Sequence, residues 1–393
     1  MARETTHTAA DEPVLGERTG NARSEPARDG VPERVETVIV GGGQAGLATG
    51  YQLTRRGREC VVLDADERIG DSWRRRWPTL RLYSPARLDE LPGMRFPAPA
   101  RSYPTAPEMA DYLEAYAAEL ELPVRSGVAV DGLERSGERY LVSAGEQRWE
   151  ADNVVVATGV FRDPHVPDFA ADLDPRIRQL HSSEYRGPEQ LQDGPVLVVG
   201  AAHSGADIAY EVAAGHETVL SGRHTGELPF RCDGPRARYL MPPVMRFVAT
   251  RVLTVRTPMG RKARAKIRTS GGPLLRYRSP ELRAAGVERV LERTVGVVDG
   301  MPVLAGGRVV EAANVIWCTG FRNDYGWIRF ALPIGEDGFP EQDRGAVRGW
   351  PGLFFVGLLF LDSFSSMLIL GARRDAERVA AQIASRPVGV AGA

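Results

Sequence analysis

Cysteine is scarce in this chain of 393 residues, and the three that occur exclude several classes of protein. Cys60, Cys232 and Cys318 lie far apart, form no CxxC pair and lack the spacing of a zinc site. Three scattered cysteines exclude a disulfide framework and are typical of a reducing compartment.

Long apolar runs are also lacking. The longest run, residues 353–361, falls far short of the ~20 residues that a membrane-spanning helix needs. The first thirty-odd residues contain no apolar stretch of a signal peptide, and we expect a disordered tail at 1–33 and a C-terminal tail at 386–393. The sequence therefore predicts a soluble, cytoplasmic protein without stable membrane insertion.

A surplus of positive charge is absent too. Fifty basic and fifty-one acidic residues give a net charge of −1, which is against a nucleic-acid partner because phosphate binding needs excess cations. Lysine occurs only at Lys262 and Lys266, so a single arginine among the other 48 basic residues is weak evidence for function. At ~150 residues per domain, the length indicates two domains, or one inserted into another.

A glycine-rich turn follows the first strand pattern. The β-branched run 36–40 leads into Gly41, Gly43 and Gly46 of a GxGxxG motif, and a helical pattern follows. In this setting Gly41 permits a tight turn, Gly43 admits a pyrophosphate and Gly46 lets the helix pack against the strand. The helix N-terminus attracts the anion. Asp64 ends the next strand, where a carboxylate can bind the adenosine ribose.

The same unit recurs about 160 residues later. The apolar run 195–199 leads into residues 200–205, Gly-Ala-Ala-His-Ser-Gly, and another helical pattern follows. Ala202 stands in place of the middle glycine, so its methyl group weakens or displaces pyrophosphate binding. At the end of the next strand Arg223 replaces the acid, where a guanidinium could favour the 2′-phosphate of NADP; a solvated arginine is the alternative. His203 is interpreted as a helix-start residue rather than a base.

The candidate cofactor-binding residues of the first unit are Gly41, Gly43, Gln44, Ala45, Gly46 and Asp64, and those of the second are Gly200, Ser204, Gly205, Ser221 and Arg223. Ser204 could donate a hydrogen bond to phosphate. A chain with two such units most often binds FAD at the first and a nicotinamide nucleotide at the second, so that hydride can pass between them. We therefore predict an α/β fold with two Rossmann-like domains.

Four further segments resemble motifs of one family. Residues 68–73, Arg-Ile-Gly-Asp-Ser-Trp, resemble the GG[ST]W segment of flavin-containing and Baeyer–Villiger monooxygenases. Residues 154–159, Val-Val-Val-Ala-Thr-Gly, resemble the strand that closes the FAD domain, and 316–321 resemble its echo. Residues 351–357, Pro-Gly-Leu-Phe-Phe-Val-Gly, resemble the strand that returns to the flavin. The chain thus resembles flavin-containing monooxygenases of the short bacterial kind, similar to the plant indole-pyruvate monooxygenases.

The resemblance implies that an NADP domain, residues 162–307, is inserted into an FAD domain made of 34–161 and 308–385. It implies that NADPH reduces FAD, that O2 adds at flavin C4a, and that the resulting (hydro)peroxide passes one oxygen atom to a small organic substrate. The further FAD contacts that it implies are Ser72, Trp73, Val128, Thr158, Gly159 and Gly357.

The family motifs are not all intact. FxGxxxHxxx[FYW] survives only in its second half, 181–185, because Pro175 and Ile177 occupy the phenylalanine and glycine positions. Tyr83 stands where eukaryotic relatives have an asparagine beside the flavin. We take Tyr83 as the candidate catalytic residue, with a packed aromatic as the alternative. His181 in the remnant motif is interpreted as a structural linker residue.

One helix and one insertion are visible in the remaining pattern. Thr105 and Glu108 form a capping box that predicts a helix to about residue 120. Residues 230–280 combine apolar stretches with arginines, and Pro242-Pro243 is expected to break a long helix there. This insertion is interpreted as packing on the nicotinamide domain. A lid beside the substrate pocket and an amphipathic patch for a membrane or anionic partner are alternatives.

Three other functions are alternatives to this one. A disulfide reductase needs a redox-active cysteine pair that the chain lacks, and residues 73–78 do not match the WxWxIP element of tryptophan halogenases. A flavin- or nucleotide-binding sensor without turnover is the non-enzymatic alternative. The sequence leaves open the substrate and whether the chain forms a homo-oligomer.

Overall fold

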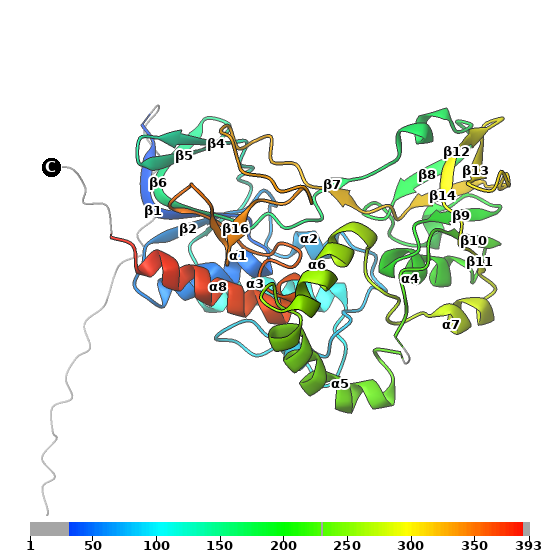
Figure 1. Cartoon of the computed structure of the whole chain (residues 1–393), viewed down its shortest axis with the longest axis horizontal. Coiled ribbons are helices and arrows are strands. Elements are labelled where there is room, and N and C mark those ends of the chain that lie inside the picture. The colour runs from blue at the N-terminus through cyan, green and yellow to red at the C-terminus, as the bar shows by residue number, and fades with distance from the viewer. Residues whose placement is uncertain (1–30, 229–230, 388–393) are drawn as a thin grey trace, which may run out of the picture.

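The computed structural model describes residues 31–228 and 231–387, in two lobes joined by extended connections (Figure 1). The expected tails lie almost wholly outside the described residues; β1 (Glu33–Val40) already begins at residue 33.

The larger lobe is built on a nine-stranded sheet in the order β16-β17-β18-β6-β1-β2-β3, with the antiparallel β4 and β5 attached to β6. β1 pairs in parallel with β2 and β6, so its apolar residues are buried on both faces, as a β-branched run requires. The remaining strands of this sheet are β2 (Cys60–Leu63), β3 (Val124–Arg125), β4 (Gly132–Ser136), β5 (Arg139–Ala144), β6 (Gln147–Val156), β16 (Gln342–Asp343), β17 (Ala346–Val347) and β18 (Leu353–Phe355).

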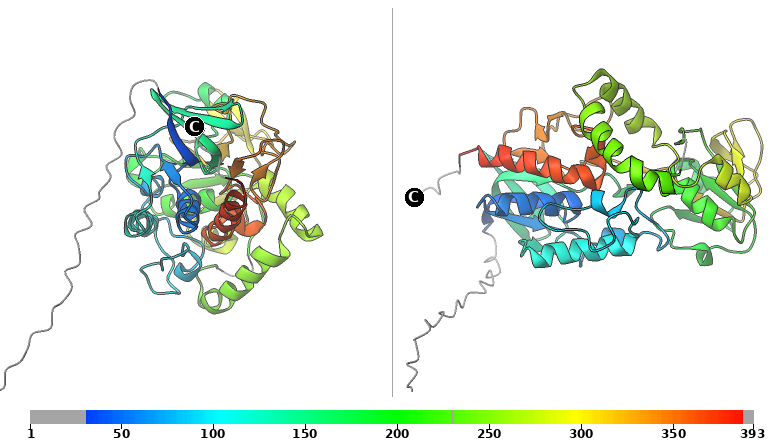
Figure 2. Two further views of the ribbon diagram at one scale, coloured as in Figure 1. Left: turned by 90° about the vertical axis from the view of Figure 1, so that its left-hand side faces the viewer. Right: turned by 90° about the horizontal axis from the view of Figure 1, so that it is seen from below.

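Three helices cover one face of this sheet: α1 (Gln44–Thr54), α3 (Ala106–Glu119) and α8 (Ile369–Ala384). Figure 2 shows them stacked side by side below the strands. The predicted capping box is confirmed, since the Thr105 side chain accepts from the Glu108 amide and Glu108 reaches back to the Thr105 amide. Short helical segments complete the lobe: α2 (Asp71–Arg74), η1 (Ala86–Leu88) and η5 (Phe364–Met367).

The smaller lobe holds a five-stranded parallel sheet in the order β11-β10-β9-β14-β8. Its strands are β8 (Arg178–His181), β9 (Val196–Val199), β10 (Thr218–Ser221), β11 (Glu288–Val290) and β14 (Asn314–Trp317). The helices α4 (His203–Val212) and α7 (Ser279–Ala284) cover one face. The other face meets η2 (Asp168–Asp172) and the hairpin of β12 (Thr294–Val298) and β13 (Met301–Leu304). The turn η3 (Pro188–Gln190) leads into β9.

The expected boundary at residue 308 is corrected by this sheet. β14 pairs with both β9 and β8, so the chain stays in the smaller lobe until about residue 318. The two crossings between lobes then run antiparallel as β7 (Asp163–Pro164) and β15 (Phe321–Arg322). Beside them the His181 ring bonds to the Gly320 carbonyl at 3.0 Å, which places this histidine at the crossing.

The insertion forms α5 (Pro235–Phe247), the π-helical turn η4 (Val248–Val252) and α6 (Pro258–Ser270), which project from the body of the molecule (Figure 2). The expected helix break at Pro242-Pro243 is wrong, because both prolines lie inside α5. The insertion also packs on more than the smaller lobe. Arg268 donates to the Leu359 carbonyl, and Arg374 of α8 donates to the Thr250 carbonyl.

Candidate nucleotide-binding site

The first glycine loop is fixed by close backbone contacts. Gly41 has a φ of +112°, and a Cβ there would lie 2.6 Å from the Ala157 carbonyl oxygen. A Cβ at Gly46 would collide with the Gly41 carbonyl oxygen. Both positions therefore require glycine to bring β1, α1 and the end of β6 together.

Gly43 differs from its two neighbours. Its backbone is ordinary, with φ −74° and ψ −177°, and a Cβ there would meet no heavy atom within 4 Å. Nothing in the fold demands glycine here, so the open space in front of the loop is the place where a ligand would need the close approach. α1 also begins without a side-chain cap, in contrast to α3, whose N-terminus has a capping box. An uncapped helix start facing open space fits the pyrophosphate of a dinucleotide.

Asp64 lies directly beside this loop. Its carboxylate accepts from the amides of Gly42 and, at 2.8 Å, Asp66, which fixes its orientation. Burial raises the pKa of Asp64 above its usual value, and the hydrogen bonds from the Asp66 and Gly42 amides oppose that shift. Val128 joins the same cluster because its amide donates to the Asp64 carbonyl at 2.8 Å. Only the Val128 carbonyl is therefore left for an adenine amino group.

The other predicted FAD contacts lie on the segments after β6 and β18 and on α2. Thr158 and Gly159 continue the segment that Gly41 packs against, and a Cβ at Gly357 would lie 3.0 Å from the Ala45 Cβ. Ser72 and Trp73 sit on α2, where Trp73 packs against the core under α1 and Ser72 is exposed.

The second loop repeats the backbone geometry of the first. Gly200 has a φ of +105° against the Cys318 carbonyl, and a Cβ at Gly205 would collide with the Gly200 carbonyl oxygen. α4 begins at His203 without a side-chain cap. Ser204 is half-buried in its first turn. The backbone of the second loop thus has the same geometry as that of the first, with glycine required at the same two positions.

The centre of the second loop is covered by the insertion. A Cβ at Gly271 would lie 3.2 Å from the Ala202 methyl group, and one at Gly272 would lie 2.8 Å from Nε2 of His203. The His203 ring packs against the segment 271–273, and burial lowers its pKa to about 4. His203 is therefore neutral at pH 7.

Two arginines, exposed Arg223 and half-buried Arg289, lie beside the end of β10. Ser221, predicted to touch the nucleotide, is buried and its hydroxyl pairs with Thr294 at 2.7 Å. Arg223 is exposed. Arg289 of β11, which the sequence did not single out, donates to the carbonyls of Leu220 (3.0 Å), Gly222 (2.8 Å) and Arg223 (3.4 Å). Arg289 therefore fixes the backbone that presents the Arg223 side chain.

Tyr83 lies between the lobes in a buried polar cluster. Its hydroxyl donates to Asp207 of α4 at 3.0 Å, and its ring centroid lies 5.0 Å from that of His203. Arg276 donates to the Asp207 carboxylate at 3.3 Å and to the Arg81 carbonyl at 2.8 Å. Burial raises the pKa of Asp207 to about 6, although the Arg276 cation opposes the shift.

The phenol of Tyr83 is held as a donor. Burial, followed by the nearby Asp207 charge, raises the pKa of Tyr83 well above its usual value, so it stays protonated at neutral pH. It can donate a hydrogen bond but cannot act as a base. The sequence missed Asp207 and Arg276, because residues so far apart carry no local pattern that links them to Tyr83.

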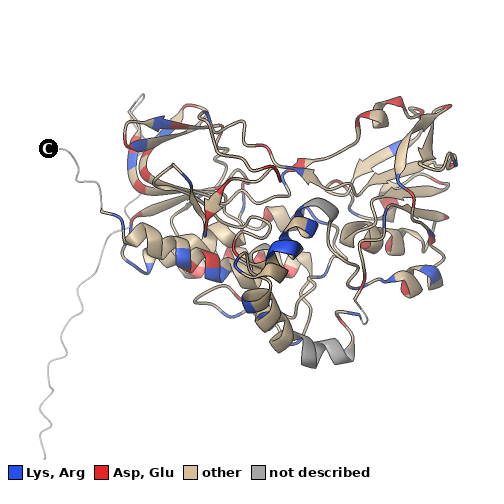
Figure 3. Cartoon of the chain, viewed as in Figure 1, with Lys and Arg blue, Asp and Glu red and all other residues tan. Residues whose placement is uncertain are grey.

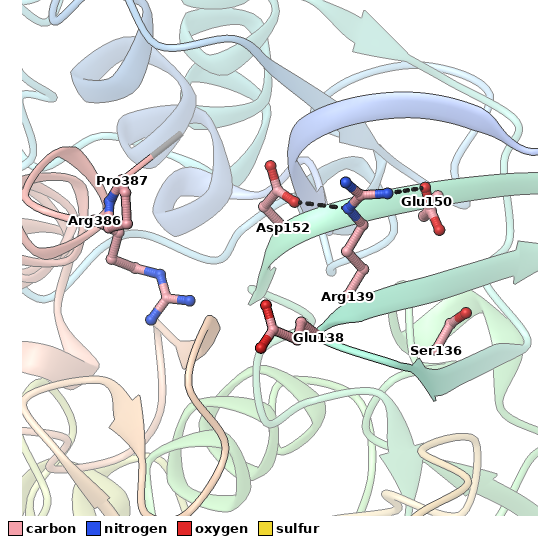
Figure 4. Close-up of a pocket in the computed structure, with 7 residues that line it drawn as sticks. All are labelled: Ser136, Glu138, Arg139, Glu150, Asp152, Arg386 and Pro387. Atoms are coloured by element: carbon pink, nitrogen blue, oxygen red, sulfur yellow. Dashed lines mark hydrogen bonds and ion pairs between the residues drawn. The ribbon is translucent and has the colours of Figure 1, made fainter. Parts of the chain in front are cut away.

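A surface pocket lies away from both loops. It is lined by Ser136, Glu138, Arg139, Glu150, Asp152, Arg386 and Pro387 (Figure 4). Arg139 bridges Glu150 at 3.0 Å and Asp152 at 3.2 Å. These charges satisfy one another, and the pocket shares no residue with the nucleotide loops.

Known proteins share this arrangement. The sequence profile of the pyridine nucleotide-disulphide oxidoreductase family matches residues 38–231. An uncharacterized CzcO-like oxidoreductase of Geobacillus kaustophilus is 34% identical over 344 residues, which cover 87% of this chain and 96% of the relative. The indole-3-pyruvate monooxygenase YUCCA1 of Oryza sativa is 29% identical, with 89% and 93% covered. The solved flavin-containing monooxygenase of Stenotrophomonas maltophilia is 28% identical, with a TM-score of 0.71 and 89% and 98% covered.

The chain belongs to the flavin-containing monooxygenase family. Membership confirms the predicted family, the two-domain α/β fold and the cofactors FAD and NADPH. Like its relatives, this flavin-containing monooxygenase is an oxidoreductase. None of the helices in the described ranges has the length and apolar character needed to cross a membrane.

Proposed function

We propose that this flavin-containing monooxygenase uses NADPH and O2 to insert one oxygen atom into a small organic substrate. The observation that carries the proposal is the pair of uncapped glycine loops, one followed by an acid and the other by an arginine. Bound FAD would supply the redox chemistry: electrons from NADPH would let O2 give one oxygen atom to the substrate and the other to water.

In this proposal the first loop holds FAD. The amides at the start of α1 bind the pyrophosphate across the open space at Gly43. Asp64, kept in place by two backbone amides, accepts from the ribose hydroxyls, and the Val128 carbonyl contacts adenine. Thr158, Gly159 and the returning strand at Gly357 close the site around the cofactor.

The second loop holds NADPH. The start of α4, with Ser204, binds the pyrophosphate, and Arg223 binds the 2′-phosphate in a charge-assisted bond. Ala202 and the covering segment 271–273 occupy the space that the first loop leaves open. We therefore infer that this segment shifts when NADPH binds, and that binding is weaker than at an all-glycine loop.

Tyr83 acts as a positioning residue in this scheme. Its hydroxyl is engaged with Asp207, on the helix that binds NADPH, so it links the lobes beside the nicotinamide site. A Tyr83→Phe variant keeps the ring and removes this link. We expect kcat to change less than about threefold while thermal stability falls, since a hydrogen bond to a buried carboxylate contributes about 1.5–3 kcal/mol. A drop in kcat of about a hundredfold with unchanged stability would make Tyr83 a catalytic residue instead.

The function is tested with FAD-loaded protein. We expect NADPH to bleach the flavin absorbance anaerobically, and aerobic turnover to consume one O2 per NADPH with a reactive substrate. A panel of a thioether, a tertiary amine, a cyclic ketone and an arylpyruvate, run under ¹⁸O2, identifies the class by one labelled atom in the product. Flavin that stays oxidised with NADPH, or peroxide as the sole oxygen product with every substrate, would contradict the proposal.

The cellular setting belongs to the same proposal. Cys60, Cys232 and Cys318 are all free thiols, which supports a reducing, cytoplasmic location. No nucleic-acid partner is proposed, because the net charge is −1.

A further inference from the structure

The insertion has an unusual charge composition for this chain. Between Asp233 and Glu281 the sequence contains no acidic residue and twelve Arg and Lys residues, although the whole chain is balanced. Both lysines of the protein, Lys262 and Lys266, lie here on α6. Figure 3 shows Lys and Arg along α6 without any Asp or Glu. The segment is therefore a local patch of positive charge on a nearly neutral protein.

An apolar stripe runs along the outer side of α5. Tyr239 is 60% exposed and Phe247 is 62% exposed, and exposed Pro243 lies one turn from each. Positions 239, 243 and 247 follow the i, i+4, i+8 spacing that places residues on one helix face. Val244, 55% exposed, widens the stripe. Exposing large apolar side chains to water is unfavourable, so an exposed row of them indicates a contact surface.

Exposed apolar and basic residues recur along η4 and α6. Arg251 is exposed one turn after Phe247, and on α6 Met259 is 62% exposed beside the exposed Lys262. Apolar tips and cations thus alternate along one projecting element. We call Tyr239, Val244, Arg246, Phe247, Arg251, Met259, Arg261 and Lys262 the outer insertion surface.

The cations of this surface differ from those that hold the insertion in place. Arg264 and Arg268 pair with Asp337, and Arg276 pairs with Asp207. Among the described residues no carboxylate pairs with Arg246, Arg251, Arg261 or Lys262. Their charge is therefore available to an external anion.

We infer that the outer insertion surface docks this enzyme onto a membrane that carries anionic phospholipid. Large apolar tips flanked by cations are what an interfacial helix uses: the tips enter the acyl boundary while the cations meet phosphate head groups. Nucleic acid would engage the cations but gives Val244 and Met259 nothing to pack against. A second copy of the chain would bring the same positive patch against itself, which charge repulsion opposes.

The docked element is tied to the nucleotide site. The Val255 amide donates to the Asp362 carbonyl at 2.9 Å, and the Phe364 amide donates to the Leu253 carbonyl at 2.9 Å, just before α8. At the other end the insertion supplies the segment 271–273 over the second loop. The element that would dock thus continues, through α6, into the segment that covers the second loop.

The test is vesicle flotation of the full, FAD-loaded chain. We expect binding to phosphatidylcholine vesicles that contain about 30 mol % phosphatidylglycerol, little binding to pure phosphatidylcholine, and release as NaCl shortens the screening length. A cation near such a surface contributes roughly a fivefold change in affinity. Phe247→Ser with Arg251→Glu removes an apolar tip and reverses one charge, so affinity should fall at least tenfold.

A matched pair elsewhere controls for nonspecific effects. Leu291, 59% exposed, and Arg293, also exposed, lie beyond the NADP-domain sheet edge. Leu291→Ser with Arg293→Glu should leave vesicle binding unchanged, and both doubles should keep wild-type NADPH oxidation in the absence of vesicles. Should the insertion double misfold, Phe247→Trp provides a gain of signal: its emission should shift to the blue with anionic vesicles, whereas that of Leu291→Trp should not.

Three outcomes would overturn the inference. The first is equal binding to neutral and anionic vesicles, or none to either. The second is equal weakening by the two double substitutions. The third is a wild-type dimer that the insertion double converts to monomer while vesicle binding is unaffected, which would assign the surface to self-association. Loss of NADPH oxidation in wild type would instead contradict the proposed function and leave the membrane result standing.

Discussion

The Gly43→Val variant probes the first loop without disturbing the fold around it. Because Gly43 has φ −74° and a Cβ there meets nothing within 4 Å, valine fits the apoprotein. Gly43 is the N-cap of α1, where valine is less favourable than glycine, so we expect the free energy of unfolding of the apoprotein to fall by only about 1 kcal/mol. FAD, however, can no longer approach the loop amides. Loss of two charge-assisted hydrogen bonds at about 1.5–3 kcal/mol each weakens binding by about 10²–10⁴.

Gly46→Ala is the matched comparison. Its Cβ would collide with the Gly41 carbonyl oxygen, so β1 and α1 must separate and the apoprotein itself is destabilised. The assays are the flavin-to-protein absorbance ratio after purification, FAD titration by fluorescence quenching, and thermal unfolding of both apoproteins. Stoichiometric FAD in Gly43→Val, or a fall in its apoprotein stability like that of Gly46→Ala, would refute the assignment of the open space to pyrophosphate.

Four further predictions concern the second loop. Arg223→Ala should raise KM for NADPH relative to NADH about tenfold or more, because a charge-assisted bond of ~1.5–3 kcal/mol is lost; unchanged preference would make it a surface arginine. Arg289→Lys keeps the charge but loses the carbonyl contacts, so NADPH preference should fall without loss of kcat, and wild-type kinetics would contradict its positioning role. Ala202→Gly should lower Kd for NADPH severalfold in a binding titration, and a higher Kd would count against the second phosphate site. The pKa of His203 is lowered from 6.5 to about 4, so its contribution to the free energy of unfolding is full above pH 6.5 and is lost as pH falls through about 4. In chemical denaturation, the free energy of unfolding of His203→Asn should therefore change with pH by about 3 kcal/mol less than that of wild type over this range. An unaltered pH profile would mean that the ring is not buried.

Much of the fold could be predicted because its signals are local. The run 36–40 and the loop at Gly41 specify strand, turn and helix within about twenty residues. The capping box at Thr105 likewise needs only four residues. The domain boundary was harder: β14 resembles the strand that closes the FAD domain, but its hydrogen bonds go to β9 and β8. The sequence of one strand does not determine which distant strand it pairs with.

At the prolines of α5, by contrast, a local sequence rule gave a wrong prediction. A local rule predicted a break at Pro242-Pro243, yet the helix continues and a π-helical turn follows at 248–252. The Arg101 guanidinium lies 4.4 Å from the centroid of the Tyr239 ring of α5, and tertiary contacts can override a local preference.

By itself, the sequence determined the two glycine loops, their order and the family, because phosphate binding depends on backbone shape, and glycine spacing sets that shape. Only the tertiary structure decided that Tyr83 donates to Asp207, that Arg289 fixes the backbone of Arg223, and that the insertion covers the second loop. These contacts join residues from different strands and lobes. They form when the chain closes around a shared core, and no spacing along the sequence encodes them.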